Sequence, residues 1–254
     1  MALKSMMIAT LALFSSACVS VPASDTTVSV QTDCAGILKQ STKWVANRDD
    51  TPDVDDWAIG VRQVYADATT HIQGVASTLN IGQWAVIMDL DETVLNNVQY
   101  QIERDQTCTK YKGESWFKWT QRMQAPLVPG AIEFIKQVNQ LGGHVAFVTN
   151  RKETEQLATE RNLADLNIKR QYDFRILLTY AEPAGSRGKQ ARFELVPAML
   201  GAMGYSDVAI VAYVGDASGD KPDALTNTRF FCIDQGNMYG SKPCALPSAS
   251  GQIR

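Results

Sequence analysis

Short apolar runs alternate with amphipathic stretches along most of the chain. The runs are rich in β-branched and aromatic residues and lie at residues 84–88, 144–148, 175–178, 208–214 and 230–233. They predict five strands, because such side chains fit a pleated, buried surface. Between them, apolar positions recur every three or four residues, which predicts helices. Strands that alternate with helices predict an α/β fold with a Rossmann-like parallel sheet.

Proline and glycine mark the ends of the predicted helices. Pro129 stands where one helix begins and Gly142-Gly143 where it ends, as the first-turn preference of proline and the terminal preference of glycine suggest. A second helix follows Arg151 and ends near residue 165. A third begins near residue 188, and Pro197 is expected to kink it. Its apolar face is formed by Phe193, Val196, Leu200 and Met203.

The pattern also divides the chain into parts. Trp57, Val61, Val64 and Tyr65 recur at helical spacing in a polar region, and Asp49–Asp56 separates two helices there, which predicts a small helical accessory layer. The expected parts are a signal peptide at 1–17, a tether at 18–34, accessory helices at 35–83, an α/β core at 84–241 with a cap insertion at about 97–127, and a tail at 242–254.

The N-terminus has the features of an export signal. Lys4 precedes an apolar run from Met6 to Phe14, and Ser15-Ser16-Ala17-Cys18 follows. Small residues before a cysteine resemble the bacterial lipobox, which implies lipid attachment at Cys18, although Ser15 replaces the usual aliphatic residue. Because Val19 is not the aspartate that retains lipoproteins at the inner membrane, we expect an outer-membrane lipoprotein. The alternative is plain cleavage nearby.

Composition narrows the class of protein. The 254 residues are 45% hydrophobic and 20% charged, which suits one globular domain with a smaller attachment. The formal net charge of −3 argues against nucleic acid as a partner, because phosphate backbones select basic surfaces. Beyond the N-terminus there is no apolar stretch of the ~20 residues that a transmembrane helix needs. None of this indicates an oligomeric state.

The remaining cysteines leave two interpretations open. In an exported protein, four cysteines allow two disulfides with three connectivities. They can equally be small buried hydrophobic residues, and none has zinc-site spacing. They are Cys34, Cys108, Cys232 and Cys244.

Two acidic residues directly follow the most apolar strand. Asp89 and Asp91 come after the run 84–88. In open α/β sheets, ligands bind at the carboxyl ends of the strands. Two neighbouring carboxylates repel each other unless a cation or a shared proton lies between them. The pair therefore predicts covalent phosphoryl transfer, in which one acid attacks and the other handles the proton. The alternative is that both merely cap the next helix.

Other strand ends carry matching polar residues. They are Thr149 and Asn150, Lys189 before a helix, and Asp216 with Asp220 four positions on. Parallel strands bring these ends to one sheet edge. There, Thr149 and Lys189 can bind phosphate oxygens, and Asp216 can complete an oxygen-rich site for Mg²⁺. Alone, Thr149 can be a helix cap and Lys189 a surface lysine; their joint occurrence in order favours a site.

Together these segments resemble the haloacid dehalogenase superfamily, and more narrowly its class C acid phosphatases, which are bacterial outer-membrane lipoproteins that include 5′-nucleotidases. The matching segments are 86–100, 147–151, 189–192 and 213–220. The resemblance implies a haloacid dehalogenase-like fold, Asp89 as nucleophile and Asp91 as acid and base. It also implies Mg²⁺ held by Asp89, the Asp91 backbone carbonyl and Asp216, with Asp220 in support.

Substrate recognition is expected from the cap insertion and a late loop. Tyr239 lies in a segment that fits the family's substrate loop, and Tyr100 or Trp116 can stack on a flat ring such as a nucleobase or nicotinamide. The alternative for Trp116 and Trp119 is packing within the insertion, since they lie one helical turn apart. Ser218, and Ser241 onward, depart from the family pattern, and the latter departure leaves the substrate open.

The predicted function is hydrolysis of phosphate monoesters, with 5′-nucleotides as the expected substrates. Two alternatives remain: a surface lipoprotein that binds a ligand without catalysis, and a phosphotransferase that uses an alcohol acceptor. Other hydrolase chemistries lack their residues. There is no Gly-x-Ser-x-Gly motif, and His71 and His144 are the only histidines.

Overall fold

The computed structural model describes residues 56–181 and 188–233. The predicted signal peptide, tether, C-terminal tail and first accessory helix lie outside these residues, as do Cys18 and Tyr239. Within residues 56–181 and 188–233, no helix combines the length and apolarity needed to cross a bilayer.

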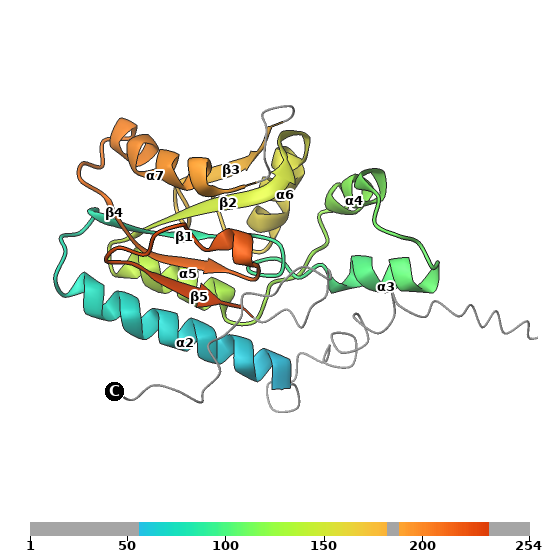
Figure 1. Ribbon diagram of the computed structural model, residues 1–254, viewed down its shortest axis with the longest axis horizontal. Coiled ribbons are helices and arrows are strands. Elements are labelled where there is room, and N and C mark those ends of the chain that lie inside the picture. Colours follow the sequence, from blue (N-terminus) through green and yellow to red (C-terminus); the bar gives the residue numbers. More distant parts are fainter. Residues whose placement is uncertain (1–55, 182–187, 234–254) are drawn as a thin grey trace, which may run out of the picture. The chain divides into compact units, whose positions relative to one another are not determined.

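The core is a five-stranded sheet in the order β3-β2-β1-β4-β5, and every neighbouring pair is parallel (Figure 1). The strands are β1 (Trp84–Met88), β2 (His144–Lys152), β3 (Ile176–Tyr180), β4 (Ala209–Gly215) and β5 (Arg229–Cys232). This confirms the parallel α/β sheet. Each strand lies within a few residues of its predicted position. The largest difference is β2, which continues through the expected start of a helix.

β1 occupies the centre of the sheet because its residues are apolar on both faces. All five are buried, as expected for a strand covered by helices on both sides. At its carboxyl end, Met88 lies opposite Phe147 of β2 and Val214 of β4. The residues that follow these three strands therefore meet at one edge of the sheet.

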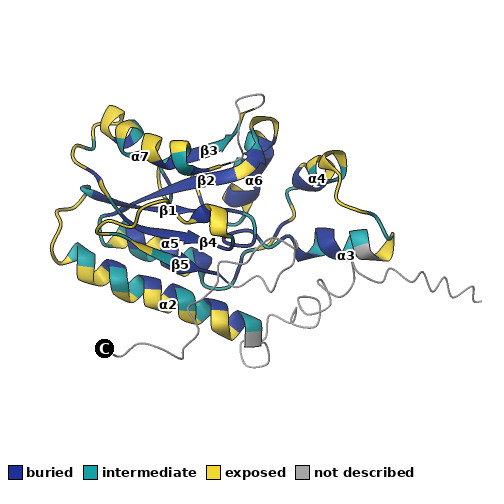
Figure 2. Cartoon of the chain, viewed as in Figure 1, coloured by how far each residue is buried: buried dark blue, intermediate teal, exposed yellow. Residues whose placement is uncertain are grey.

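The two faces of the sheet form separate apolar cores. Trp84, Val86 and Met88 of β1 pack with α2 (Asp56–Ala76) and α5 (Ala131–Gln140). Ala85 and Ile87, which alternate with them, pack with α7 (Gln190–Ala202). Figure 1 shows α2 and α5 on one side of the sheet and α7 on the other, and Figure 2 shows the sheet buried between them. Fully burying one large aliphatic side chain contributes roughly 1.5–3 kcal/mol.

Two details of the helices differ from expectation. In α7, Phe193, Val196 and Leu200 are buried as predicted, but Met203 follows the last helical residue and is 49% exposed. α7 includes Pro197 within its length, and the kink predicted there stays a prediction. The helix expected after Arg151 begins later, as a short 3₁₀ turn (Glu153–Glu155) followed by α6 (Gln156–Asp165).

The insertion after β1 is helical. It contains α3 (Val98–Gln106) and α4 (Gly113–Thr120), which Figure 1 shows outside the helical layers that cover the sheet. Tyr100 packs against Trp116 and Trp119, with ring centroids 5.1 and 6.3 Å apart. Tyr100 and Trp119 are buried in the same apolar core as α2 and α5, and Trp116 packs against it, which supports the packing interpretation of these aromatic residues.

Both described cysteines are oxidised. Cys108, just after α3, and Cys232, at the end of β5, are disulfide-bonded. For these two residues, the disulfide interpretation is confirmed and the interpretation as free buried cysteines is not. Cys34 and Cys244 lie outside the described residues, so the connectivity stays as open as the sequence left it.

Candidate active site

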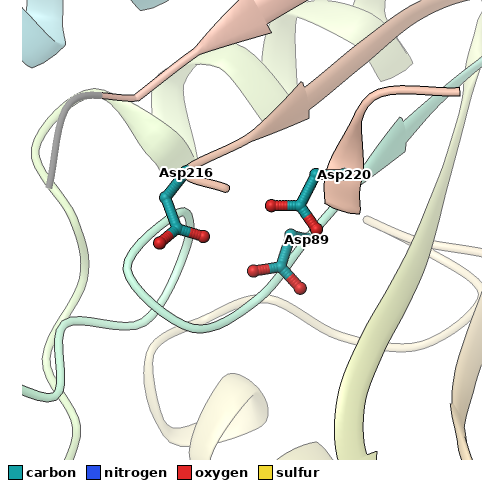
Figure 3. Close-up of side chains that lie close together, drawn as sticks. All are labelled: Asp89, Asp216 and Asp220. Carbon is teal, nitrogen blue, oxygen red and sulfur yellow. The ribbon is translucent and has the colours of Figure 1, made fainter. Parts of the chain in front are cut away.

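Three carboxylates converge at the carboxyl ends of β1 and β4. Asp89 follows β1, Asp216 follows β4, and Asp220 lies in a short 3₁₀ turn (Ser218–Asp220) (Figure 3). One oxygen from each lies within 4.8 Å of the others, and all three residues are buried. Gly215 permits this approach, because a Cβ at that position would lie 2.2 Å from the Cβ of Asp220. The acids predicted from separate strand ends thus form one cluster.

Lys189 supplies the positive charge of this cluster. Its Nζ donates a hydrogen bond to Oδ1 of Asp220 at 2.6 Å and another to Oδ1 of Asp89. The other oxygen of Asp220, Oδ2, accepts the backbone N–H of Ala217 at 2.9 Å. Lys189 is only 4% exposed, which rules out a surface lysine. With both oxygens engaged, Asp220 acts as a support for the cluster.

The cluster carries more negative charge than Lys189 neutralises. When all three carboxylates are ionised, one ammonium leaves a net charge of two negative units. Burial, with Asp220 and Asp91 nearby, raises the pKa of Asp89 to about 7, despite the opposing effect of Lys189. Burial and the neighbouring carboxylates also raise the pKa of Asp216. Burial lowers the pKa of Lys189, but Asp220 and Asp89 outweigh this and raise it.

The chemistry of this cluster fits a hard divalent cation. Carboxylate oxygens are the ligands that Mg²⁺ prefers, and a cation among them would offset their mutual repulsion. Asp89 and Asp216 are the acids best placed to hold it, since Asp220 is engaged with Lys189 and Ala217. Within residues 56–181 and 188–233, this is the one group of His, Cys, Asp or Glu side chains arranged for a metal.

Asp91 does not join the cluster. Its Oδ1 accepts hydrogen bonds from Nε of Arg151 at 2.9 Å and from Nδ2 of Asn97 at 2.9 Å, and Nη2 of Arg151 lies 2.8 Å away. The Asp91 side chain keeps 20% exposure, whereas that of Arg151 keeps 1%. The two strand-end acids therefore have different partners. Neither caps the next helix, because Oδ1 of Asn96 accepts the N–H of Val98 at the start of α3.

The end of β2 lies beside both groups. Thr149 is fully buried, and its Oγ1 accepts the N–H of Arg151 at 3.1 Å within the strand, so it does not cap a helix. Arg192 of α7 donates to the carbonyl oxygen of Thr149 and, at 2.6 Å, to Oδ1 of Asn150. The structure thus brings the residues predicted to bind phosphate to the edge that carries the acids.

Comparison with known proteins agrees with this arrangement. A sequence model described as "HAD superfamily, subfamily IIIB (Acid phosphatase)" matches residues 16–242, which is most of the chain. The chain belongs to this family. The family hydrolyses phosphate monoesters, so the acid phosphatase is a phosphoric monoester hydrolase of the haloacid dehalogenase superfamily, as the resemblance of its four segments predicted.

Solved structures support the fold. The acid phosphatase is similar to the class C acid phosphatase from Bacillus anthracis, with a TM-score of 0.63 and 22% sequence identity over 79% of this chain and 86% of that one. The same Bacillus anthracis enzyme with tungstate bound gives a TM-score of 0.61 and 21% identity, with the same coverage. At this level of identity the likeness establishes the haloacid dehalogenase-like fold.

A cavity lies between the insertion and the ends of β2 and β3. Its volume is about 260 Å³, and its lining includes Trp116, Asn150 and Lys152 together with the rings of Tyr111, Phe117 and Tyr180. Trp116 lines this cavity, and its contact with a substrate stays a prediction. Tyr100 does not line it: Tyr100 is 3% exposed, its hydroxyl pairs with Oγ of Ser115 at 2.9 Å, and its ring is packing.

Sequence reasoning missed three residues of the acid phosphatase site. Arg151, Asn97 and Arg192 each bond a residue predicted to act there, and none was assigned a role. Arg151 is a buried charged residue near the end of β2. A charged residue at that position was a usable signal, because charged groups are rarely buried unless they are paired. Asn97 lies well beyond the end of β1 and carried no such signal.

Proposed function

We propose that the acid phosphatase hydrolyses its substrates through a phosphorylated Asp89, with Mg²⁺ bound beside it. The observation that carries this proposal is the Asp89 carboxylate itself. It lies at the end of the central strand, within 4.8 Å of Asp216 and Asp220, and bonds Lys189. Mg²⁺ held by Asp89 and Asp216, and by the Asp91 carbonyl that the family resemblance implies, would neutralise charge on the transferring phosphoryl group.

The reaction takes two steps. A carboxylate oxygen of Asp89 attacks phosphorus, the bond to the ester oxygen breaks, and Asp91 gives its proton to the departing alcohol. Asp91 then takes a proton from water, whose oxygen attacks phosphorus and releases phosphate and free Asp89. Lys189, Thr149 and Asn150 would hold the phosphate oxygens, and Asp220 would keep Lys189 in place.

The decisive experiment uses the purified mature protein and a panel of phosphate monoesters, with and without Mg²⁺. Phosphate release that needs the metal, and a phosphorylated peptide containing Asp89 after acid quenching, are the expected results. Release without any such peptide would contradict the covalent step. An added alcohol in the same assay tests the phosphotransferase alternative, because a transferase would form a new ester at the expense of free phosphate.

The proposed substrates are 5′-mononucleotides, including nicotinamide mononucleotide. The cavity between the insertion and the ends of β2 and β3 supports this, because Trp116 and other aromatic rings line it beside Asn150 and can stack on a flat ring. Tyr239, outside the described residues, is proposed to complete the wall. In Tyr239→Ala the preference for nucleotides over sugar phosphates should collapse. Equal losses on both substrate types would mean that Tyr239 does not contact the base.

The acid phosphatase is further proposed to be an exported lipoprotein, anchored to a bacterial outer membrane through lipid on Cys18. The disulfide-bonded Cys108 and Cys232 support export, because disulfides persist in oxidising compartments. Mass spectrometry should find the mature N-terminus at a lipidated Cys18, and Cys18→Ala should release the protein from membranes. A mature N-terminus elsewhere would refute the anchor.

A further inference from the structure

The Asp91 carboxylate is held through a single oxygen. Oδ1 receives Nε of Arg151, Nη2 of Arg151 and Nδ2 of Asn97, all at 2.8–2.9 Å. No residue within 56–181 or 188–233 donates a hydrogen bond to Oδ2. The three donors therefore fix the orientation of the carboxyl group through Oδ1. This leaves Oδ2 as the oxygen that can carry a proton.

Asn97 has no freedom to turn. Its Oδ1 accepts Nε1–H of Trp119 at 2.8 Å and Nη2–H of Arg151 at 3.3 Å. Because indole and guanidinium nitrogens only donate, that side of the amide must be the oxygen, and the NH₂ must point to Asp91. The backbone N–H of Asn97 donates to Oε1 of Glu92 at 2.9 Å. Asn97 is also fully buried.

The insertion reaches both residues that hold Asp91. Trp119 of α4 bonds Asn97, and Trp116, one turn earlier, has its ring centroid 5.7 Å from the guanidinium carbon of Arg151. Trp116 also lines the cavity between the insertion and the sheet, whereas Trp119 is 2% exposed. The position of α4 is therefore tied to the orientation of the Asp91 carboxyl group.

We propose that Asn97 is a positioning residue for proton transfer by Asp91, and that Trp119 links this alignment to the insertion. The inference rests on the proposed function, in which Asp91 protonates the departing oxygen. It goes further by assigning the orientation of the Asp91 carboxyl group to the hydrogen bonds that run from Trp119 through Asn97 to Asp91, with Arg151 bonded to both Asn97 and Asp91. An insertion held in place would then favour protonation of basic leaving groups, while weakly basic ones would depart without it.

The test compares two substrates that share a benzene ring but differ in leaving group. Benzyl phosphate releases a strongly basic alkoxide that needs a proton, whereas p-nitrophenyl phosphate releases a stable phenolate. In Asn97→Ala, kcat/KM for benzyl phosphate should fall by ~10²-fold, the lower end of proton-transfer effects, and for p-nitrophenyl phosphate by far less. This ratio reports the first phosphoryl transfer, so slow hydrolysis of phosphorylated Asp89 cannot mimic the result.

Trp119→Phe is the milder variant, since it removes the N–H donor and keeps an aromatic ring. It should show the same selective loss at a smaller size, severalfold for benzyl phosphate, even if Asn97→Ala fails to fold. Asn96→Ala is the matched control, because Asn96 only caps α3, and it should show no selectivity.

Each outcome decides a different question. Equal losses on both substrates in Asn97→Ala and Trp119→Phe would overturn the positioning role and leave a structural one. A selective loss in Asn97→Ala with none in Trp119→Phe would overturn the link to the insertion. Failure of the unaltered enzyme to release phosphate from either ester would instead refute the proposed function.

Discussion

Asp89 and Asp91 are one residue apart, yet they lie in opposite electrostatic environments. Asp89 shares its surroundings with Asp216 and Asp220, and Lys189 balances only part of their charge. Asp91 faces the buried guanidinium of Arg151 and the amide of Asn97. The first environment has too little positive charge for its three acids, and a bound cation would supply the rest. In the second environment, Arg151 and Asn97 already balance the charge of Asp91. Two neighbouring carboxylates can therefore perform two different tasks.

The comparison also shows what each environment depends on. The Asp89 cluster depends on bringing like charges together, which Gly215 allows by its lack of a Cβ. The Asp91 group depends on the insertion, through Asn97 and Trp119. The effects of substitutions in the Asp89 cluster should therefore depend on whether metal is bound, and the effects of substitutions in the Asp91 group should not.

The largest expected effect is the loss of the nucleophile. Asp89→Asn should abolish detectable phosphate release and leave the fold intact, because an amide cannot form the acyl phosphate. Asp91→Asn should lose ~10²–10⁴-fold, the usual contribution of a proton-transfer group. Phosphate-release assays on both variants, with circular dichroism as the folding control, measure the difference. Near-normal turnover by the Asp89 variant would remove the basis of the mechanism.

Metal removal comes next and should affect activity and stability together. A strong chelator should abolish phosphate release, Mg²⁺ should restore it, and Asp216→Ala should weaken the rescue. Because the pKa of Asp89 is raised to about 7, the metal-free folded protein binds protons more tightly than the unfolded chain. Its stability should fall as pH rises from about 4 towards 7.

Thermal unfolding tests the same point without an activity assay. The rise in Tm on adding Mg²⁺ should be larger at pH 8 than at pH 5, because protons and the metal relieve the same charge repulsion. Asp216→Ala should reduce that rise. A rise in Tm of equal size at both pH values, in both proteins, would mean that Mg²⁺ binds away from the cluster.

The Asp91 group predicts a loss of stability that metal cannot restore. Arg151→Met leaves the carboxylate of Asp91 without its cation. The expected cost is about 3 kcal/mol, the lower end of the range for buried pairs, because Asp91 keeps 20% exposure. Arg170→Met is the control, since its pair with Glu160 is 34% and 27% exposed and is worth about 1 kcal/mol or less. Urea unfolding with and without Mg²⁺ measures the loss in free energy of unfolding for both variants. If the loss for Arg151→Met depended on Mg²⁺, the Asp89 cluster and the Asp91 group would not be independent.

The sequence predicted the Asp89 environment better than the Asp91 environment, and the reason is physical. Asp89 and Asp216 directly follow strands and Lys189 directly precedes α7, and a parallel sheet brings such positions to one edge whatever the details of packing. The parallel sheet itself was predictable from the alternation of strands and helices. Alternation of strands and helices says nothing, however, about which way an amide turns. The role of Asn97 follows from its bonds to Trp119 and Arg151, which only the packed insertion creates.

Tyr100 and Trp116 show the same limit for aromatic residues. Both lie in the insertion and both were candidates for stacking on substrate. In the structure Tyr100 is packed inside the insertion and Trp116 lines the cavity. Spacing along a helix identifies rings that share a face. Which ring faces a cavity depends on tertiary contacts that periodicity does not contain.

The smallest expected effect concerns this cavity. Trp116→Ala removes a ring that can stack on a flat leaving group, and such stacking is worth ~1–3 kcal/mol per base at nucleic-acid sites. The preference for 5′-mononucleotides over sugar phosphates, measured as the ratio of kcat/KM, should therefore fall by roughly tenfold.

Lys118→Ala is the matched control on the same helix, because Lys118 forms only an exposed pair with Glu114. Since Trp116 also touches Arg151, the variant can lower turnover of all esters slightly. Only a change in the ratio between flat and non-aromatic substrates assigns the ring to recognition, and an unchanged ratio would leave Trp116 as packing against the Asp91 group.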